Sequence, residues 1–302
     1  MKRVIAYLQG GLGNQCFIYA AARALSLRAG ATLSFNLDLF LEDRVYRRRL
    51  GLDSFVCKMT CLPVSGKVHR MIASLRSRLL GRFCAGWGDY RCDRRPYKYR
   101  PLPLVWEDAL LLDGYWQSEK YFLDAKEQLL LDFRLRDGSW VASDPLARQI
   151  GAEANSIFLH VRSYKEVPGK SDGRCAIDMR DYYRNALRYL SGRMGNGTVF
   201  VFSDDLGWSR RHVLTDDVLK DSPFNFVFDS VNSSQLRDFT LMRMCKHGIV
   251  ADSSFSWWAG WLGEQDRLSR GEEALRLHVN RRVMNDDFWP DRWIAISPSS
   301  LG

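Results

Sequence analysis

The chain has 302 residues, of which 46% are hydrophobic and 26% charged, and its formal net charge at pH 7 is +9. This composition is typical of a soluble globular protein, and the length accommodates two domains of ordinary size. The apolar run Val4–Leu8 is too short for the core of a signal peptide, and no uncharged apolar run reaches membrane-spanning length. We therefore expect a cytoplasmic protein.

The seven cysteines are scattered along the chain and contain no CxxC pair. Several lie in apolar runs, as buried free thiols do. A zinc site would have to draw on Cys57, Cys61, His69, Cys84 and Cys92, whose spacings match no recurrent zinc motif. We therefore predict structural thiols and no bound metal.

Residues 40–100 hold the excess positive charge, with 15 lysines and arginines against 5 acidic residues. Within them, Lys67–Arg82 places apolar residues on one helical stripe and most of its basic residues elsewhere. Such a helix suits an anionic membrane surface or a polyanionic acceptor, although a stripe packed on the protein core remains the alternative. No motif for nucleic-acid binding accompanies the charge, so we predict no nucleic-acid partner.

In the first half of the chain, a strand at 4–8, a glycine turn at 10–15, a helix at 15–29 and a strand at 31–37 open a doubly wound sheet. The turn resembles a dinucleotide fingerprint at Gly11 and Gly13, but its third position is Cys16. Asp38 lies about where a ribose-binding acid would be. An NAD-dependent oxidoreductase is therefore one alternative function.

The alternation of strands and helices is clearest from residue 156 onward. We predict strands at 157–161, 198–202, 225–228 and 249–251, separated by helices, which implies a second parallel sheet. Gly248 is expected to stop the helix at 235–247, and Gly263 to stop the helix that follows the last strand. We place the domain boundary near residue 150, which gives domains 1–150 and 151–302, the first with a basic insertion at about 40–100.

Polar residues follow the strands of this second sheet, at the edge where parallel sheets bind ligands. They are His160 with Arg162, the run Ser203–Asp205, and the run Asp252–Ser254. An arginine and the first amides of a helix can hold a diphosphate, and a carboxylate can accept from the N–H groups of a base. The structural alternatives are a domain-interface ion pair for Arg162, a helix cap for Asp204 and a satisfied core histidine for His160.

Four stretches, taken together, resemble the bacterial α-1,2-fucosyltransferases of glycosyltransferase family 11. They are LQGGLGNQCFIYAAARAL (8–25), GYWQSEKYF (114–122), FVFSDDLGW (200–208) and DFTLMRMCKHGIVADSSFSWWAGWL (238–262). The resemblance implies an α/β fold of the GT-B type, in which two Rossmann-like domains with parallel sheets face a cleft. It also implies that the second domain holds the donor, GDP-β-L-fucose.

The HxRRxD motif of that family corresponds to HVRSYKE at 160–166. His160 and Arg162 are retained, whereas the second arginine is replaced by Ser163 and the aspartate position by Lys165. The resemblance therefore implies Arg162 as a catalytic clamp on the diphosphate and His160 as a donor-site residue. Glu166, one position later, is our candidate for the general base.

The resemblance extends to residues of both predicted domains. It implies Asn14 near the diphosphate and acceptor, and Asp204 at the guanine. The remaining donor-binding residues that we expect are Gly11, Gly13, Ser253, Ser254, Phe255 and Ser256.

The predicted function is therefore an inverting, metal-independent transfer of L-fucose to the 2-hydroxyl of a galactose, making an α-1,2 linkage. We expect the acceptor to be a lipid-linked precursor of a surface polysaccharide such as O-antigen. The enzyme would then work at the inner face of the bacterial inner membrane, with the basic region toward the lipid. A non-catalytic glycan-binding module is the other alternative.

Overall fold

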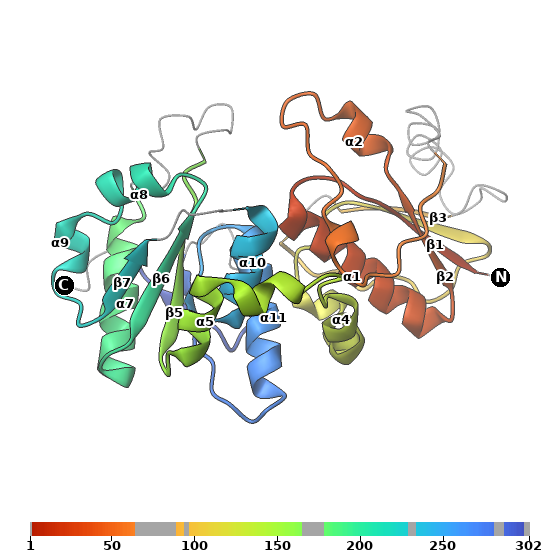
Figure 1. Ribbon diagram of the computed structural model, residues 1–302. Coiled ribbons are helices and arrows are strands. Elements are labelled where there is room, and N and C mark those ends of the chain that lie inside the picture. The colour runs from red at the N-terminus through yellow and green to blue at the C-terminus, as the bar shows by residue number, and fades with distance from the viewer. Residues whose placement is uncertain are drawn as a thin grey trace. The chain divides into compact units, whose positions relative to one another are not determined.

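The computed structural model describes residues 2–63, 89–93, 97–164, 178–228, 234–280 and 287–298. The chain divides into two compact units. Unit 1 comprises Met1–Arg136 and Val283–Pro290, and unit 2 comprises Asp137–Arg282 and Asp291–Gly302. Each unit contains a parallel sheet with helices packed on it (Figure 1), which confirms the predicted α/β class with two Rossmann-like sheets.

Unit 1 is built on a four-stranded sheet of order β2-β1-β4-β3. Every neighbouring pair in it is parallel. The strands are β1 (Arg3–Tyr7), β2 (Thr32–Asn36), β3 (Asp89–Cys92) and β4 (Ala109–Asp113). The strands expected at 4–8 and 31–37 are confirmed, whereas β3 lies in the basic 40–100 region and was not predicted.

Among the described residues of unit 1, the longest helix is α1, which begins within the glycine turn. The other helices described there are short. The helices are α1 (Leu12–Ala29), α2 (Asp38–Glu42), η1 (Leu52–Ser54), η2 (Glu119–Tyr121), η3 (Leu123–Ala125) and α4 (Lys126–Asp132). A buried carboxylate joins α4 to α1, because Asp132 accepts from Tyr19 Oη and Arg23 Nε, each at 2.8 Å.

Unit 2 has six parallel strands in the order β10-β9-β8-β5-β6-β7. They are β5 (Ser156–Val161), β6 (Thr198–Ser203), β7 (Asn225–Phe228), β8 (His247–Ile249), β9 (Arg276–Val279) and β10 (Ile294–Ile296). The four predicted strands are present. The last two were missed because each is only three or four residues long and β9 contains Arg276 and His278.

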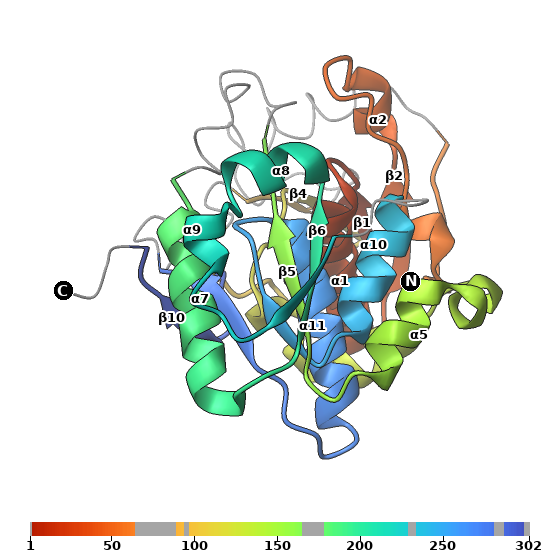
Figure 2. The ribbon, with the colours of Figure 1, turned by 60° about the vertical axis from the view of Figure 1, so that its left-hand side comes forward.

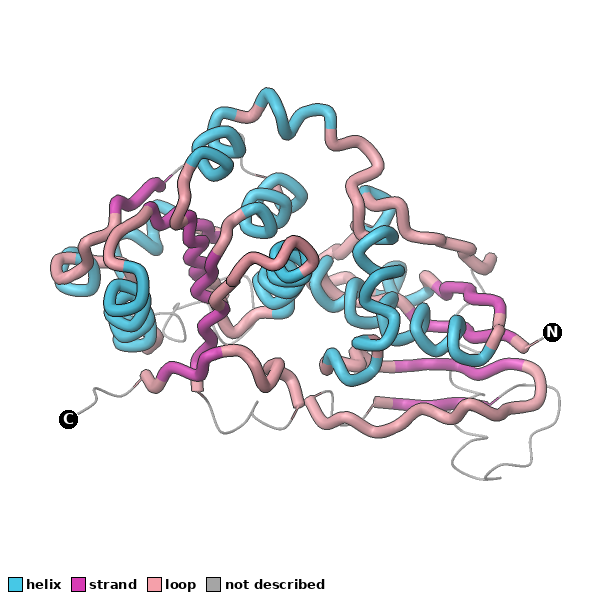
Figure 3. Tube along the Cα trace, turned by 90° about the horizontal axis from the view of Figure 1, so that it is seen from below, coloured by secondary structure: helices cyan, strands magenta, loops and turns pink. Residues whose placement is uncertain are grey.

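Helices cover both faces of this second sheet, as the view along the strands in Figure 3 shows. The helices are η4 (Ser139–Ser143), α5 (Pro145–Ala152), α7 (Arg180–Met194), α8 (Leu206–His212), α9 (Asp216–Leu219), α10 (Gln235–Met244) and α11 (Ser254–Leu268). β5 is buried along its whole length. Successive side chains of a strand point to opposite faces. Ile157 and Leu159 accordingly join the α7 core cluster, whereas His160 packs on Phe255 of α11.

The two glycines expected to end helices have other roles. Helix α10 ends at Met244, and Gly248 lies inside β8. A Cβ on Gly248 would lie 2.2 Å from Cε1 of the buried Phe158 ring, so only glycine fits between the strands there. Gly263 lies within α11, where a Cβ would lie 2.4 Å from the carbonyl oxygen of Arg243. Neither glycine ends a helix, and both are required because neighbouring atoms leave no space for a Cβ.

In the part of the chain that the structure describes, no helix is both long enough and apolar enough to cross a lipid bilayer. The Lys67–Arg82 segment lies outside the described residues.

Candidate functional site

The strand order of unit 2 places a topological switch point at the carboxyl end of β5. From β5 the chain builds β6 and β7 on one side, and then returns to build β8 and β9 on the other. Ligands of doubly wound sheets bind beyond the strand ends at such a point. The loop after β5 therefore lies between the loop after β6 and the loop after β8. Figure 2 shows α8 beginning beyond the end of β6.

The loop after β5 is bound to the loop after β6 by a charged cluster. Arg162 Nη1 donates to Asp204 Oδ2 at 2.5 Å, and the side chains are 21% and 22% exposed. Ser163 donates its backbone N–H to Asp204 Oδ1 at 2.7 Å and its hydroxyl to Asp204 Oδ2 at 2.8 Å. Arg162 therefore forms an ion pair within unit 2. The helix cap proposed for Asp204 belongs to its neighbour, since Asp205 accepts from the N–H of Trp208 at 3.0 Å.

The same loop is bound on its other side to the loop after β8. Tyr164 donates its hydroxyl to the carbonyl oxygen of Asp252. The guanidinium carbon of Arg162 lies 5.7 Å from the centre of the Tyr164 ring. Tyr164 has a φ of 58°, a left-handed conformation that is uncommon for a bulky residue and often marks a functional site. Sequence reasoning missed Tyr164, and its backbone conformation is the signal that identifies it.

Helix α11 begins beside this loop, and its amino terminus is capped by a serine. Ser253 Oγ accepts from the N–H of Phe255 at 3.3 Å. Ser253, Ser254 and Phe255 are half-buried, so the first turn of the helix remains accessible. Ser256 is fully buried, and its hydroxyl is 3.4 Å from the carbonyl oxygen of Ala251. The start of a 15-residue helix attracts anions, but Ser256 supports that start from within instead of facing a ligand.

His160 is the last but one residue of β5 and is 4% exposed. Its Nδ1 is buried and has no hydrogen-bond partner among the residues that the structure describes. The pKa of His160 is lowered to about 4, mainly by burial, while Asp204 raises it and Arg162 lowers it. The imidazole is therefore neutral at pH 7.

The glycine turn in unit 1 opens helix α1. Gly10 has a φ of 76°, and Gly11 is the N-cap of α1, where no side chain caps the first amides. Gly13 is buried inside the helix. Asn14 Oδ1 accepts from Gln117 Nε2 at 3.0 Å, which joins the turn to the segment after β4.

Asp38, the candidate ribose-binding acid, is 5% exposed. It accepts from Asn36 Nδ2 at 3.1 Å, so its carboxylate is engaged inside unit 1. Glu166, our candidate for the general base, lies outside the described residues, as do His69 and Cys84. Cys57 is buried, and both Cys61 and Cys92 are exposed. Within the described ranges, no three His, Cys, Asp or Glu side chains form a group that could hold a metal ion.

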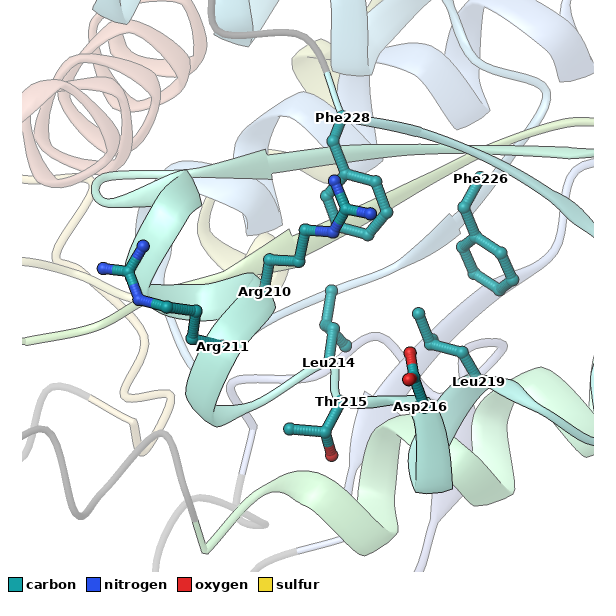
Figure 4. A pocket seen from close by; sticks show the side chains of 8 residues that line it. All are labelled: Arg210, Arg211, Leu214, Thr215, Asp216, Leu219, Phe226 and Phe228. Carbon is teal, nitrogen blue, oxygen red and sulfur yellow. The ribbon is translucent and has the colours of Figure 1, made fainter.

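A hollow of about 640 Å³ lies on unit 2 among α8, α9 and β7 (Figure 4). The guanidinium carbon of Arg210 is 5.0 Å from the centre of the Phe228 ring, at one side of the hollow. The hollow contains none of the predicted site residues. It is lined by Arg210, Arg211, Leu214, Thr215, Asp216, Leu219, Phe226 and Phe228.

Comparison with known proteins identifies the family to which the chain is similar. The family model described as glycosyl transferase family 11 matches residues 97–274. An alpha-1,2-colitosyltransferase from Escherichia coli is 30% identical over 98% of this chain and 99% of its own length. The O-antigen biosynthesis glycosyltransferase WbnK, also from Escherichia coli, is 27% identical over 93% of this chain and 98% of its own length.

A mammalian relative matches a smaller share. Galactoside alpha-(1,2)-fucosyltransferase 2 from Pongo pygmaeus is 26% identical over 60% of this chain and 53% of its own length.

Proposed function

Because this chain belongs to glycosyl transferase family 11, we propose that it transfers L-fucose from GDP-β-L-fucose to the 2-hydroxyl of a galactose, with inversion to an α-1,2 linkage. Two observations about its relatives support this proposal. The colitosyltransferase forms an α-1,2 linkage by its name, and the mammalian relative is a galactoside fucosyltransferase. The donor would bind in unit 2.

One observation carries the proposal, namely that Arg162 is held at the switch point where α11 begins. When the bond from the anomeric carbon to the β-phosphate oxygen breaks, its electron pair moves to the GDP leaving group. A guanidinium and helix-terminal amides fixed beforehand would stabilise that negative charge. The galactose 2-hydroxyl would attack from the opposite face, and Glu166 is our candidate to accept its proton.

His160 would contribute as a neutral group. Its Nδ1 is buried without a partner in the described structure, and leaving such an atom unpaired costs roughly 1–3 kcal/mol. A sugar-nucleotide donor that forms a hydrogen bond with Nδ1 would recover that free energy. We therefore assign His160 to donor binding and not to proton transfer, since its lowered pKa makes it a weak base at pH 7.

A second donor deserves a direct comparison, because the relative that matches 98% of this chain is a colitosyltransferase. Colitose is the 3-deoxy form of L-fucose, so the two donors differ by one hydroxyl. A site that hydrogen-bonds that hydroxyl would reject the deoxy donor strongly, whereas a site that only accommodates it would accept both.

The test is an assay of the purified protein with GDP-L-fucose or GDP-L-colitose and a panel of galactose-terminated acceptors. Mass and linkage analysis of the product should show one deoxy-sugar on the galactose 2-hydroxyl. Arg162→Ala should lower turnover by roughly a hundredfold or more. Arg188→Ala is the matched control, because both side chains of the Arg188–Asp221 ion pair are more than half exposed. A glycan-binding module would instead show no turnover and retain its binding in Arg162→Ala.

We also propose a lipid-linked acceptor, because the relative WbnK acts in O-antigen biosynthesis and the 40–100 region is strongly basic. Flotation with vesicles tests this part separately. Binding should require anionic lipid and should weaken when the basic residues of 67–82 are replaced by glutamine. Flotation that is independent of anionic lipid would remove the membrane proposal and leave the transferase proposal intact.

A further inference from the structure

The carboxylate of Asp204 is fully engaged by residues of its own unit. Oδ1 accepts from the N–H of Ser163 at 2.7 Å and lies 3.3 Å from the hydroxyl of Ser203. Oδ2 accepts from Arg162 at 2.5 Å and from the Ser163 hydroxyl at 2.8 Å. A carboxylate offers about four lone-pair positions, and these four bonds occupy them.

This geometry leaves little room for the role that the sequence suggested. A carboxylate that recognises guanine must accept from two N–H groups of the base. Asp204 could do so only by releasing Ser163 or Arg162, at the cost of leaving their donors unpaired. We infer that Asp204 is a positioning residue that holds Arg162 against the donor's diphosphate, and not the residue that recognises the base. This inference rests on the proposed function.

The strand order explains why Asp204 is suited to that role. Asp204 follows β6, which pairs with β5 on the side away from β8. Its bonds to Arg162 and Ser163 therefore hold the β5 loop from one side, while Tyr164 bonds to the β8 loop on the other. Arginine is long and flexible, and binding a ligand normally requires that its rotamers be ordered first. The bond to Asp204 orders the side chain before the ligand arrives.

The pair remains open to a ligand. About a fifth of each side chain is exposed, at 21% for Arg162 and 22% for Asp204. A guanidinium carries five N–H donors in a planar fork, so it can hold a carboxylate on one nitrogen and a phosphate on another. Because solvent partly screens the Arg162–Asp204 ion pair, its loss should have a moderate effect. We expect the affinity for a diphosphate to fall about tenfold.

The experiment compares three ligands on the full chain by calorimetry and NMR titration, with Asp204→Asn as the variant. Asparagine keeps the shape but removes the charge and one acceptor. We expect GDP to bind about tenfold more weakly, from loss of one charged hydrogen bond. Guanosine, which has no phosphate, should bind as it does to the wild type. The ratio of affinities for GDP and for inosine diphosphate, which lacks the base's 2-amino group, should not change.

A double-mutant cycle provides the second measurement. Once Arg162 is replaced by alanine, Asp204 has nothing to position, so Arg162→Ala and Arg162→Ala/Asp204→Asn should bind GDP equally within about twofold. Ser163→Ala, which removes only the hydroxyl bond to Asp204, should weaken GDP about threefold and leave guanosine unchanged. This milder variant gives the answer if Asp204→Asn fails to fold. Asp221→Asn, at a surface pair, is the control.

Two results would overturn the inference. One is loss of guanosine affinity or collapse of the GDP to inosine diphosphate ratio in Asp204→Asn. The other is a further loss of GDP affinity when Asp204→Asn is added to Arg162→Ala. If the wild-type protein shows no GDP binding, the proposed function fails and this inference fails with it. Base-dependent losses in a protein that does bind GDP reject the inference alone.

Discussion

Replacement of Gly248 by alanine tests how β8 is fitted against β5. The added Cβ would lie 2.2 Å from Cε1 and 2.4 Å from Cζ of Phe158, distances that carbon atoms do not adopt. Phe158 is fully buried, so either its ring or β8 must move by more than about 1 Å. Overpacking usually costs 1–3 kcal/mol, and this contact is severe, so we expect a loss of about 3 kcal/mol. The melting temperature should fall by roughly 5 °C.

Thermal and urea unfolding measure this loss, and two further variants test its cause. Phe158→Leu removes ring atoms, so its combination with Gly248→Ala should be more stable than the sum of the single losses by about 1 kcal/mol or more. Gly192→Ala is the control, because an added Cβ meets nothing within 4 Å on helix α7. It should gain roughly 0.5–1 kcal/mol. Wild-type stability in Gly248→Ala, or strictly additive losses in the double variant, would refute the packing explanation.

Two further predictions concern stability. Burial is the main cause of low histidine pKa values in this protein. The pKa is lowered to about 4 for His160 and His278 and to about 3 for His247. The unfolded chain takes up protons below pH 6.5 and the native state does not, so stability should fall between pH 6.5 and 4, by roughly 2 kcal/mol for each histidine at pH 5. Equal urea midpoints at pH 7.5 and 5 would contradict this. Asp132→Asn leaves the buried Arg23 without its charged partner and should lower the free energy of unfolding by about 3–5 kcal/mol. Asp124→Asn, at an exposed pair, should lower it by less than about 1 kcal/mol. Thermal melts distinguish the two variants.

The sequence was sufficient to predict the elements that local pattern determines. The apolar run of β1, the glycine turn and the alanine-rich helix α1 follow one another within 30 residues, and each has a strong local signal. The apolar runs of β5 and β6 were found for the same reason. Such elements need no information about what packs against them, so their approximate bounds could be read from the chain.

Other features depend on partners that are distant in the sequence. β8 was expected at 249–251 but spans His247–Ile249. Gly248 lies inside it against the Phe158 ring, a neighbour that the local sequence does not reveal. β9 was missed because it contains Arg276, whose charge is accommodated by the carbonyl oxygens of Gly260 and Lys246, at 2.8 and 2.7 Å. A buried arginine in a strand is plausible only when those acceptors are in place.

The candidate site shows the same limit. The sequence identified Arg162, Asp204 and the residues at the start of α11 as polar residues that follow strands. The strand order of unit 2 brings these residues together. The sequence could not show that the carboxylate oxygens of Asp204 accept hydrogen bonds from Arg162 and Ser163, because that geometry depends on β6 lying beside β5. Tyr164 was missed because a tyrosine in a loop has no pattern in sequence.

A crystal of the protein soaked with GDP tests the central claim most directly. The diphosphate oxygens should lie within about 2.7–3.2 Å of the Arg162 guanidinium and of amide groups at the start of α11, as charged hydrogen bonds require. Nucleotide bound elsewhere, for example in the hollow beside Arg210, with no phosphate oxygen near Arg162, would contradict the assignment of donor binding to the switch point of unit 2.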